Sequence, residues 1–240
     1  MARVNKSGNL SGAIGNLVFV NRDGKTHVRS KSKKVNQSTN TRGAATGFGK
    51  NSGDDRIRGE SITDKIQIRN YRCFSINHRT RLRLTIGEST NQDGTRKMAY
   101  LNPQPMVGTV FNNDWQWERA TNFYSEYNLS GQNTMTVHLP QLTIGEQIIF
   151  PKNAVQANLN IYAFTINANT QNIQTEILSS LSFSLEKKKD IPAQHWIFDI
   201  PQGTFWTMIL ATISYTSPKN NIAEEHKHTG TYLWAKSINP

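Results

Sequence analysis

The 240-residue chain has a single cysteine, Cys73, and no apolar segment near the roughly 18 residues that a membrane-spanning helix needs. One cysteine excludes an intrachain disulfide framework and any zinc site built on several thiolates. Residues 1–8 contain no apolar stretch typical of a secretory signal peptide, so we expect a protein that is cytoplasmic at synthesis and spans no membrane. Gly-x-Ser-x-Gly, His-Glu-x-x-His and Walker patterns are absent, so we expect no enzymatic activity, no catalytic residue and no cofactor.

Polar residues dominate the composition, yet aromatic side chains are plentiful. Hydrophobic residues make up 36% of the chain and charged residues 19%, with five Trp, seven Tyr and ten Phe. A disordered chain carries fewer aromatics and more charge than this. The composition therefore predicts packed structure with a buried core.

The net charge of +11 is concentrated in the first two-fifths of the chain. Residues 1–100 contain 20 of the 28 Lys and Arg residues and 7 of the 17 acidic residues, which gives +13, whereas residues 101–240 carry −2. Such asymmetry indicates a polyanionic partner or an acidic neighbouring subunit. A solvated basic face that keeps the protein soluble is the simpler alternative.

The basic part divides into a hairpin and an arm. Two β-type runs, 13–20 and 25–30, flank an Asp-Gly turn, and Asp and Gly tolerate the positive φ angles of tight hairpin turns. Residues 29–58 are too polar to bury enough surface to offset their ordering entropy, which predicts an extended arm or linker. We therefore divide the chain into a hairpin and arm, 1–60, and a body, 61–240, with a further boundary near 100–105.

Residues 79–86 alternate between arginine and apolar side chains. This period of two predicts a half-buried strand that presents a ladder of three arginines. Arg96 follows across a turn at 92–94, which favours a second hairpin. Residues 61–72 fit neither a helical nor a strand period.

From residue 100 onward the pattern is β throughout. Short apolar runs are separated by Asn, Gly and Pro, a spacing typical of an antiparallel β-sandwich of jelly-roll or immunoglobulin-like type. The fold class is therefore predicted to be all-β. The predicted strands are 106–111, 134–139, 147–150, 158–166, 176–185, 196–200, 205–215 and 230–236.

Residues 8–60 contain a series of short motifs: Gly12-x-x-Gly15-Asn16-x-Val18-Phe19, Asn21-Arg22-x-Gly24-Lys25-x-x-Val28-Arg29-Ser30-Lys31-x-Lys33-Lys34-Val35, Asn36-Gln37-Ser38 and Phe48-Gly49-x-x-Ser52. This series resembles the opening of a family of small, β-rich, uncharacterised proteins (a domain of unknown function) from Bacteroidota. A looser likeness covers Leu139-Pro140, Pro151-Lys152-Asn153-Ala154 and the strand that follows. The resemblance implies no catalytic activity. The chain departs from the pattern at 53–55, where Gly-Asp-Asp replaces a more helical, basic stretch.

Side chains that could support chemistry are scattered. His226 and His228 would share one side of a strand and could bind a metal, although an exposed loop accounts for them more simply. Asp55, next to Asp54, and Asp199 could pair as in a glycosidase, but a solvated acidic turn is the favoured interpretation. Cys73 has no evident partner histidine and is expected to be a small buried side chain. We therefore expect no metal site.

Trp115 and Trp117 would share one face of an extended segment. Such a pair can form a platform for a sugar or a base, or it can cap one edge of the core. The sequence leaves both interpretations open, with the core cap favoured.

These patterns favour a non-enzymatic structural protein whose basic arm contacts neighbouring subunits in a homo-oligomer or larger particle of virion, phage-tail or filament type. One alternative is a nucleic-acid-binding or packaging protein that uses non-specific electrostatics. A carbohydrate-binding sandwich using Trp115, Trp117 or Trp196 is the other. The expected contact residues for a subunit or a polyanion are Arg22, Lys25, Arg29, Lys31, Lys33, Lys34, Arg79, Arg81 and Arg83.

Overall fold

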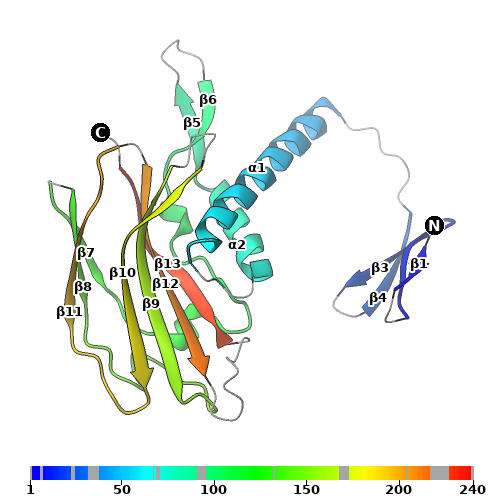
Figure 1. The fold of residues 1–240 in the computed structure, drawn as a ribbon. Helices are drawn as coiled ribbons and strands as arrows, with labels where there is room; N and C mark the ends of the chain where they lie inside the picture. Colours follow the sequence, from blue (N-terminus) through cyan, green and yellow to red (C-terminus); the bar gives the residue numbers. More distant parts are fainter. Residues whose placement is uncertain are drawn as a thin grey trace. The chain divides into compact units, whose positions relative to one another are not determined.

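The computed structural model describes residues 2–5, 8–22, 25–31, 38–66, 68, 71–90, 96–131, 133–167, 173–203, 205–216 and 227–238. The chain forms two compact units, Met1–Phe48 and Gly49–Pro240. Four antiparallel sheets make up most of its regular structure (Figure 1). The predicted mostly-β, sandwich-like fold is therefore confirmed.

A four-stranded antiparallel sheet forms the first unit, together with the start of a long helix. Its order is β1 (Arg3–Val4), β2 (Leu10–Ile14), β3 (Leu17–Arg22) and β4 (Lys25–Ser30). Strands β3 and β4 confirm the predicted hairpin, whose Asp23-Gly24 turn lies outside the described residues. A second turn at Gly15, with φ of +55°, places β2 beside β3.

Helix α1 (Thr39–Thr63) corrects the prediction of an extended arm. Ser38 caps its start, because its Oγ accepts a hydrogen bond from the Thr41 backbone N–H at 3.2 Å. Within the second unit, α1 buries a stripe at helical spacing. The buried residues of this stripe are Asp55, Arg58, Gly59 and Ile62, and Ile66 is buried just after the end of the helix.

Helix α2 (Tyr71–Arg83) corrects the predicted arginine strand. Its buried residues are Phe74, His78 and Leu82, four residues apart, so the helical period decides the local structure. Leu84, expected on the buried face of a strand, is instead 63% exposed.

The second unit contains three sheets. One has three strands in the order β11-β8-β7, one has four in the order β10-β9-β12-β13, and one is a hairpin of β5 and β6. The bounds are β5 (Ile86–Thr90), β6 (Arg96–Tyr100), β7 (Glu126–Leu129), β8 (Thr134–Leu139), β9 (Gln156–Ile166), β10 (Thr175–Glu186), β11 (Gln194–Asp199), β12 (Phe205–Thr216) and β13 (Thr229–Ile238).

Six of the eight strands predicted after residue 100 are confirmed, as β8 to β13. A second hairpin is present as β5 and β6, but its first strand is Ile86–Thr90 rather than the predicted 79–86, and its turn at 92–94 lies outside the described residues. The predictions for 106–111 and 147–150 are wrong. The 3₁₀ helix η1 (Gln104–Met106) ends at the first residue of 106–111, which makes only an isolated bridge at Val107, and 147–150 makes only isolated bridges at Ile148.

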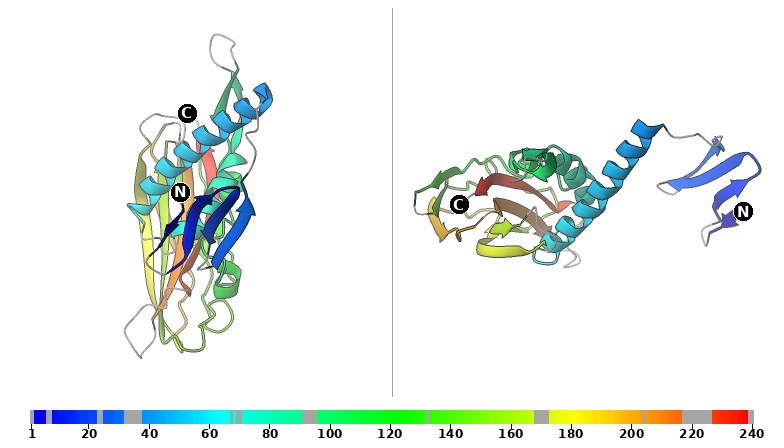
Figure 2. Two further views of the ribbon diagram at one scale, coloured as in Figure 1. Left: turned by 90° about the vertical axis from the view of Figure 1, so that its right-hand side faces the viewer. Right: turned by 90° about the horizontal axis from the view of Figure 1, so that it is seen from above.

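Two apolar layers enclose the four-stranded sheet. One of its faces packs against the three-stranded sheet, through residues such as Leu159, Ile213 and Val137. The other packs against the two helices, through residues such as Phe164 and Phe74. Figures 1 and 2 show the helices of the second unit on one side of this sheet and β7, β8 and β11 on the other. The sandwich therefore carries an added helical layer, α2 with the second-unit part of α1.

Candidate interaction surface

The sheet of the first unit has no buried side chain among the described residues 2–31. Several of its large apolar side chains are instead strongly exposed: Val4 at 65%, Ile14 at 54%, Leu17 at 46% and Val28 at 53%. An antiparallel sheet gains stability by packing one apolar face against a core. These residues therefore form a surface without a core of its own.

Strand register separates the sheet into an apolar face and a basic face. Phe19 pairs with Val28, and Leu17 pairs with both Ile14 and Ser30. Directly paired residues share a face, and neighbours along a strand point to opposite faces. Ile14, Leu17, Phe19 and Val28 therefore lie together; we call these four residues the apolar face.

The opposite face of the sheet carries basic side chains. Lys25, His27 and Arg29 occupy every second position of β4, and all three are exposed. Val18 and Val20 of β3 are their neighbours in register. Together with Lys25, His27 and Arg29 they make up what we call the basic face.

The other predicted basic contacts of the first unit are Arg22, Lys31, Lys33 and Lys34. Arg22 is the register partner of Lys25. Lys31 is exposed just after β4, where its backbone N–H donates to the Asn16 carbonyl at 2.6 Å. Lys33 and Lys34 lie outside the described residues.

The three arginines predicted to form a ladder are separated on α2. Arg79 Nε donates to Asp55 Oδ2 at 3.3 Å, Arg81 lines a pocket, and Arg83 is exposed in the last turn. Cations in the last turn are favourably placed toward the negative end of the helix dipole. The single arginine face expected from the sequence does not exist.

A buried charged cluster joins the two helices. His78 Nδ1 and Asp55 Oδ1 are 2.6 Å apart, and both side chains are 2% exposed. Burial, together with the negative charge of Asp55, raises the pKa of the Tyr232 hydroxyl well above its ordinary value. Nearby, the guanidinium of Arg58 lies 3.9 Å from the centre of the Tyr100 ring. This cluster corrects the interpretation of Asp55 as part of a solvated turn.

Both side chains of this Asp–His pair are buried, and the pair links α1 to α2. The sequence signal that could have found it is the position of His78, four residues from both Phe74 and Leu82. Asp199 lies on β11, where its carboxylate accepts a hydrogen bond from the Thr134 hydroxyl at 2.7 Å. The two aspartates are therefore engaged separately.

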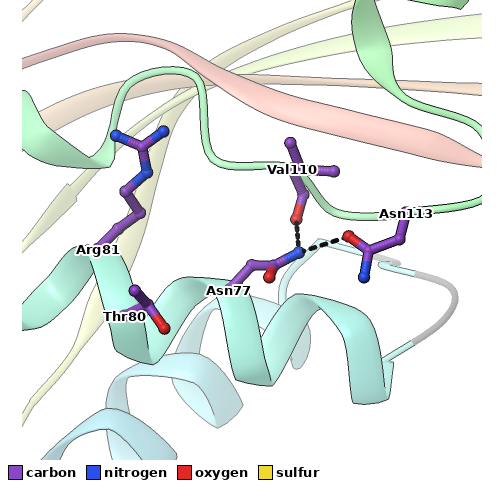
Figure 3. A pocket seen from close by; sticks show the side chains of 5 residues that line it. All are labelled: Asn77, Thr80, Arg81, Val110 and Asn113. Atoms are coloured by element: carbon purple, nitrogen blue, oxygen red, sulfur yellow. Dashed lines mark hydrogen bonds between the residues drawn. The ribbon is translucent and has the colours of Figure 1, made fainter.

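A shallow pocket of about 190 Å³ opens beside α2 (Figure 3). Asn77 Nδ2 donates to the Val110 carbonyl at 2.7 Å and to Asn113 Oδ1 at 3.0 Å. These bonds tie α2 to the loop before α3 (Trp117–Ala120). The pocket is small and open, and its amide groups already bond to one another across it.

The tryptophans considered as a possible ligand platform pack into or against the core. Trp117 is 7% exposed and packs edge-on to Phe123, with ring centroids 6.0 Å apart. Trp115 is half-buried against Tyr215, and Trp196 is 5% exposed. The sequence interpretation of Trp115 and Trp117 as a core cap agrees with these positions.

The other candidate ligands do not gather into a metal centre. His226 lies outside the described residues, and His228 is 5% exposed just before β13. Cys73 is a half-buried free thiol on α2. Within the described ranges, no group of three or more His, Cys, Asp and Glu side chains is placed to hold a metal ion.

Comparisons of the chain with protein-family models, with curated proteins and with solved structures find no match. No helix among the described residues is long and apolar enough to cross a membrane.

Proposed function

We propose that the chain is a non-enzymatic structural protein that joins neighbouring subunits of a homo-oligomeric particle, of virion, tail or filament type, through its N-terminal sheet. One observation carries the proposal: this sheet buries none of its described side chains, while one of its faces is apolar. Contiguous exposed apolar side chains mark protein interaction sites.

Covering the apolar face with a partner releases free energy of burial. Fully burying a Val, Leu, Ile or Phe side chain is worth about 1.5–3 kcal/mol, so covering the exposed half of one recovers about 1 kcal/mol. Ile14, Leu17 and Val28 are each about half exposed, at 54%, 46% and 53%. One contact of this size gives weak binding after the entropy cost of association. Many such contacts in a closed or repeating assembly give a stable particle.

The resemblance of residues 8–60 to the Bacteroidota family is part of this proposal. The shared motif covers β3, β4 and the start of α1, which include the sheet proposed to make the contacts. Gly12 and Gly15 of that motif have φ of +114° and +55°. Such φ values favour glycine, so the motif includes residues that shape the sheet.

Binding of nucleic acid is the alternative, and the basic face favours it. Lys25 and Arg29 are exposed on one side of β4, with Lys31 following. Phosphate contacts made by such side chains weaken steeply as salt rises. The apolar and basic faces are separate, so the two functions can be tested by separate substitutions.

Light scattering of the full chain after nuclease treatment, in low and high salt, tests the proposal. We expect a defined multimer in both salts, and we expect Leu17→Ser with Val28→Ser to reduce it to a monomer. Val20→Ser on the opposite face, where Val20 is 38% exposed, is the matched control and should leave the mass unchanged. All five tryptophans lie in the second unit, so tryptophan fluorescence verifies that the body remains folded.

A wild-type chain that is monomeric at high concentration would overturn the proposal, including one whose apolar face docks on its own body. If instead only Lys25→Glu with Arg29→Glu has an effect, by abolishing salt-sensitive binding of nucleic acid, the packaging alternative replaces it.

A further inference from the structure

The outer face of the three-stranded sheet brings together two histidines that lie 57 residues apart in the chain. His195 of β11 pairs with His138 of β8, and His138 pairs with Glu126 of β7. Paired residues share a face, so these three side chains form one row across the sheet. His195 and Glu126 are exposed and His138 is half-buried.

The histidine rings are already close. Their centroids are 4.5 Å apart, and the ring planes meet at 83°. Behind them, Val137 and Trp196 are buried in the sandwich core at 1% and 5% exposure. The core therefore fixes the backbone positions of the pair, while the exposed His195 ring remains free to turn about its side-chain bonds.

The charge of this sheet is opposite in sign to that of the whole chain. Strands β7, β8 and β11 contain no Lys or Arg, and their acidic residues are Glu126 and Asp199. The chain as a whole carries +11. A cation on this face therefore meets carboxylates and imidazoles from the sheet, without a positive side chain of its own strands to repel it.

We propose that His138 and His195 bind a divalent transition-metal ion, with water in the remaining coordination positions. Imidazole nitrogen is a good ligand for copper, nickel and zinc, whereas magnesium and calcium prefer oxygen. Glu126, next in register, adds negative charge and can orient His138 in the way that carboxylates support metal-bound histidines. The site is distinct from the N-terminal sheet and does not depend on the proposed function.

The spacing of the rings is within reach of a single ion. With metal–nitrogen bonds of about 2.0 Å and about 1.1 Å from nitrogen to ring centre, two imidazoles on one ion have centroids about 4.4 Å apart at a right angle and about 5.1 Å apart at the tetrahedral angle. The observed 4.5 Å falls within this range, and the exposed His195 ring can turn to direct a nitrogen at the ion. Cu(II) is the probe of choice because it binds nitrogen ligands most strongly among the first-row divalent ions.

Calorimetric titration of the full chain with Cu(II) at pH 7.5, in a weakly coordinating buffer, tests the site. We expect one strong site, weakened at least about 10-fold by His138→Gln or His195→Gln, since loss even of a ligand's supporting partner costs that much. His27→Gln removes an exposed histidine of β4 and is the matched control, with unchanged affinity expected. Electron paramagnetic resonance should show two nitrogen ligands in the wild type and one in either variant.

Copper affinity that is the same in wild type and His195→Gln would overturn the proposal, because His195 is exposed and its replacement leaves the core intact. His195→Gln alone decides the question if the half-buried His138 position disturbs folding. Affinity should also fall as the pH is lowered, because protons compete for the imidazole nitrogens.

Discussion

Removing the Asp55 carboxylate tests what holds the second-unit part of α1 in place. This carboxylate accepts from Arg79 Nε at 3.3 Å and lies 2.6 Å from His78 Nδ1. Asp55 and His78 are each 2% exposed, so water cannot replace the lost partner in Asp55→Ala. The variant leaves a buried imidazole without its acceptor and a guanidinium without its counter-charge.

Removing one partner of a buried ion pair costs about 3–5 kcal/mol. For a unit of this size, about 1 kcal/mol shifts the melting temperature by about 2–4 °C. Asp55→Ala should therefore lower the melting temperature by about 6–20 °C. Asp55→Asn keeps the shape and one acceptor oxygen, so we expect a smaller loss.

Urea denaturation followed by tryptophan fluorescence measures the effect. Glu60→Ala is the matched control on the same helix, because Glu60 pairs with Arg56 at 3.9 Å with the two side chains 53% and 70% exposed. Exposed pairs contribute about 0.2–1 kcal/mol, so this control should change little. A free energy of unfolding for Asp55→Ala within about 1 kcal/mol of wild type would refute the account of the cluster.

Two further predictions concern the body. Gly230→Ala should destabilise the chain by about 1–3 kcal/mol in urea, because its Cβ would lie 2.6 Å from the Ala211 carbonyl oxygen; an unchanged midpoint would contradict the tight packing of β12 and β13. Burial raises the pKa of Tyr127 to about 12, against a smaller lowering by the nearby Ser125 hydroxyl. The unfolded chain therefore loses this proton first, and stability should fall as pH rises from about 10 to about 12, by at most about 1.4 kcal/mol per pH unit from this group. Tyr127→Phe should flatten the decline in urea midpoint measured between pH 9 and 12, and an unaltered slope would contradict the assignment.

The sequence identified the body well, because its strands carry their own local signals. In β10, Leu181, Phe183 and Leu185 are more buried than the serines between them, as their alternation predicts. Prolines such as Pro140 and Pro201 fall between strands, where the missing N–H breaks no ladder. In this part of the chain, the alternation of apolar and polar residues and the positions of the prolines predict the same strands.

The helices escaped prediction for two different reasons. In α1 the buried stripe includes Asp55, Arg58 and Gly59, so a search for apolar periodicity finds only Ile62 in the helix and Ile66 just after it. These polar residues are buried because they pair with α2 and with Tyr100, a tertiary effect that local sequence does not report. A Cβ atom added at Gly59 would lie 3.8 Å from the Phe74 ring, so the two helices approach each other closely there.

In α2 the local pattern was misleading. Residues Arg79 to Leu84 follow a strand-like alternation. In the helix, however, Leu82 is buried on the same face as Phe74 and His78, while Leu84 is exposed. A buried histidine in the middle of the stripe concealed the helical period. Packing against the sheet outweighed the strand-like alternation.

The surface sites divide in the same way. Lys25 and Arg29 were predicted as contacts from their charge alone. The alternation of residues along β4 could also have predicted that Val28 lies on the opposite face. The pairing of His138 with His195 was not available, because it depends on β8 and β11 lying side by side. Neighbouring strands from distant parts of a chain are a property of topology rather than of local pattern.

The contrast between the two units links folding to assembly in the proposed function. The four-stranded sheet of the body is covered on both faces, so its stability is internal. The N-terminal sheet is covered on neither face among its described residues, so a partner that binds it stabilises its folded form by mass action. Under the proposed function, a neighbouring subunit would therefore stabilise the folded sheet. That coupling would suit an assembly element, since the apolar face would be best ordered in the particle, where it is also hidden from wrong partners.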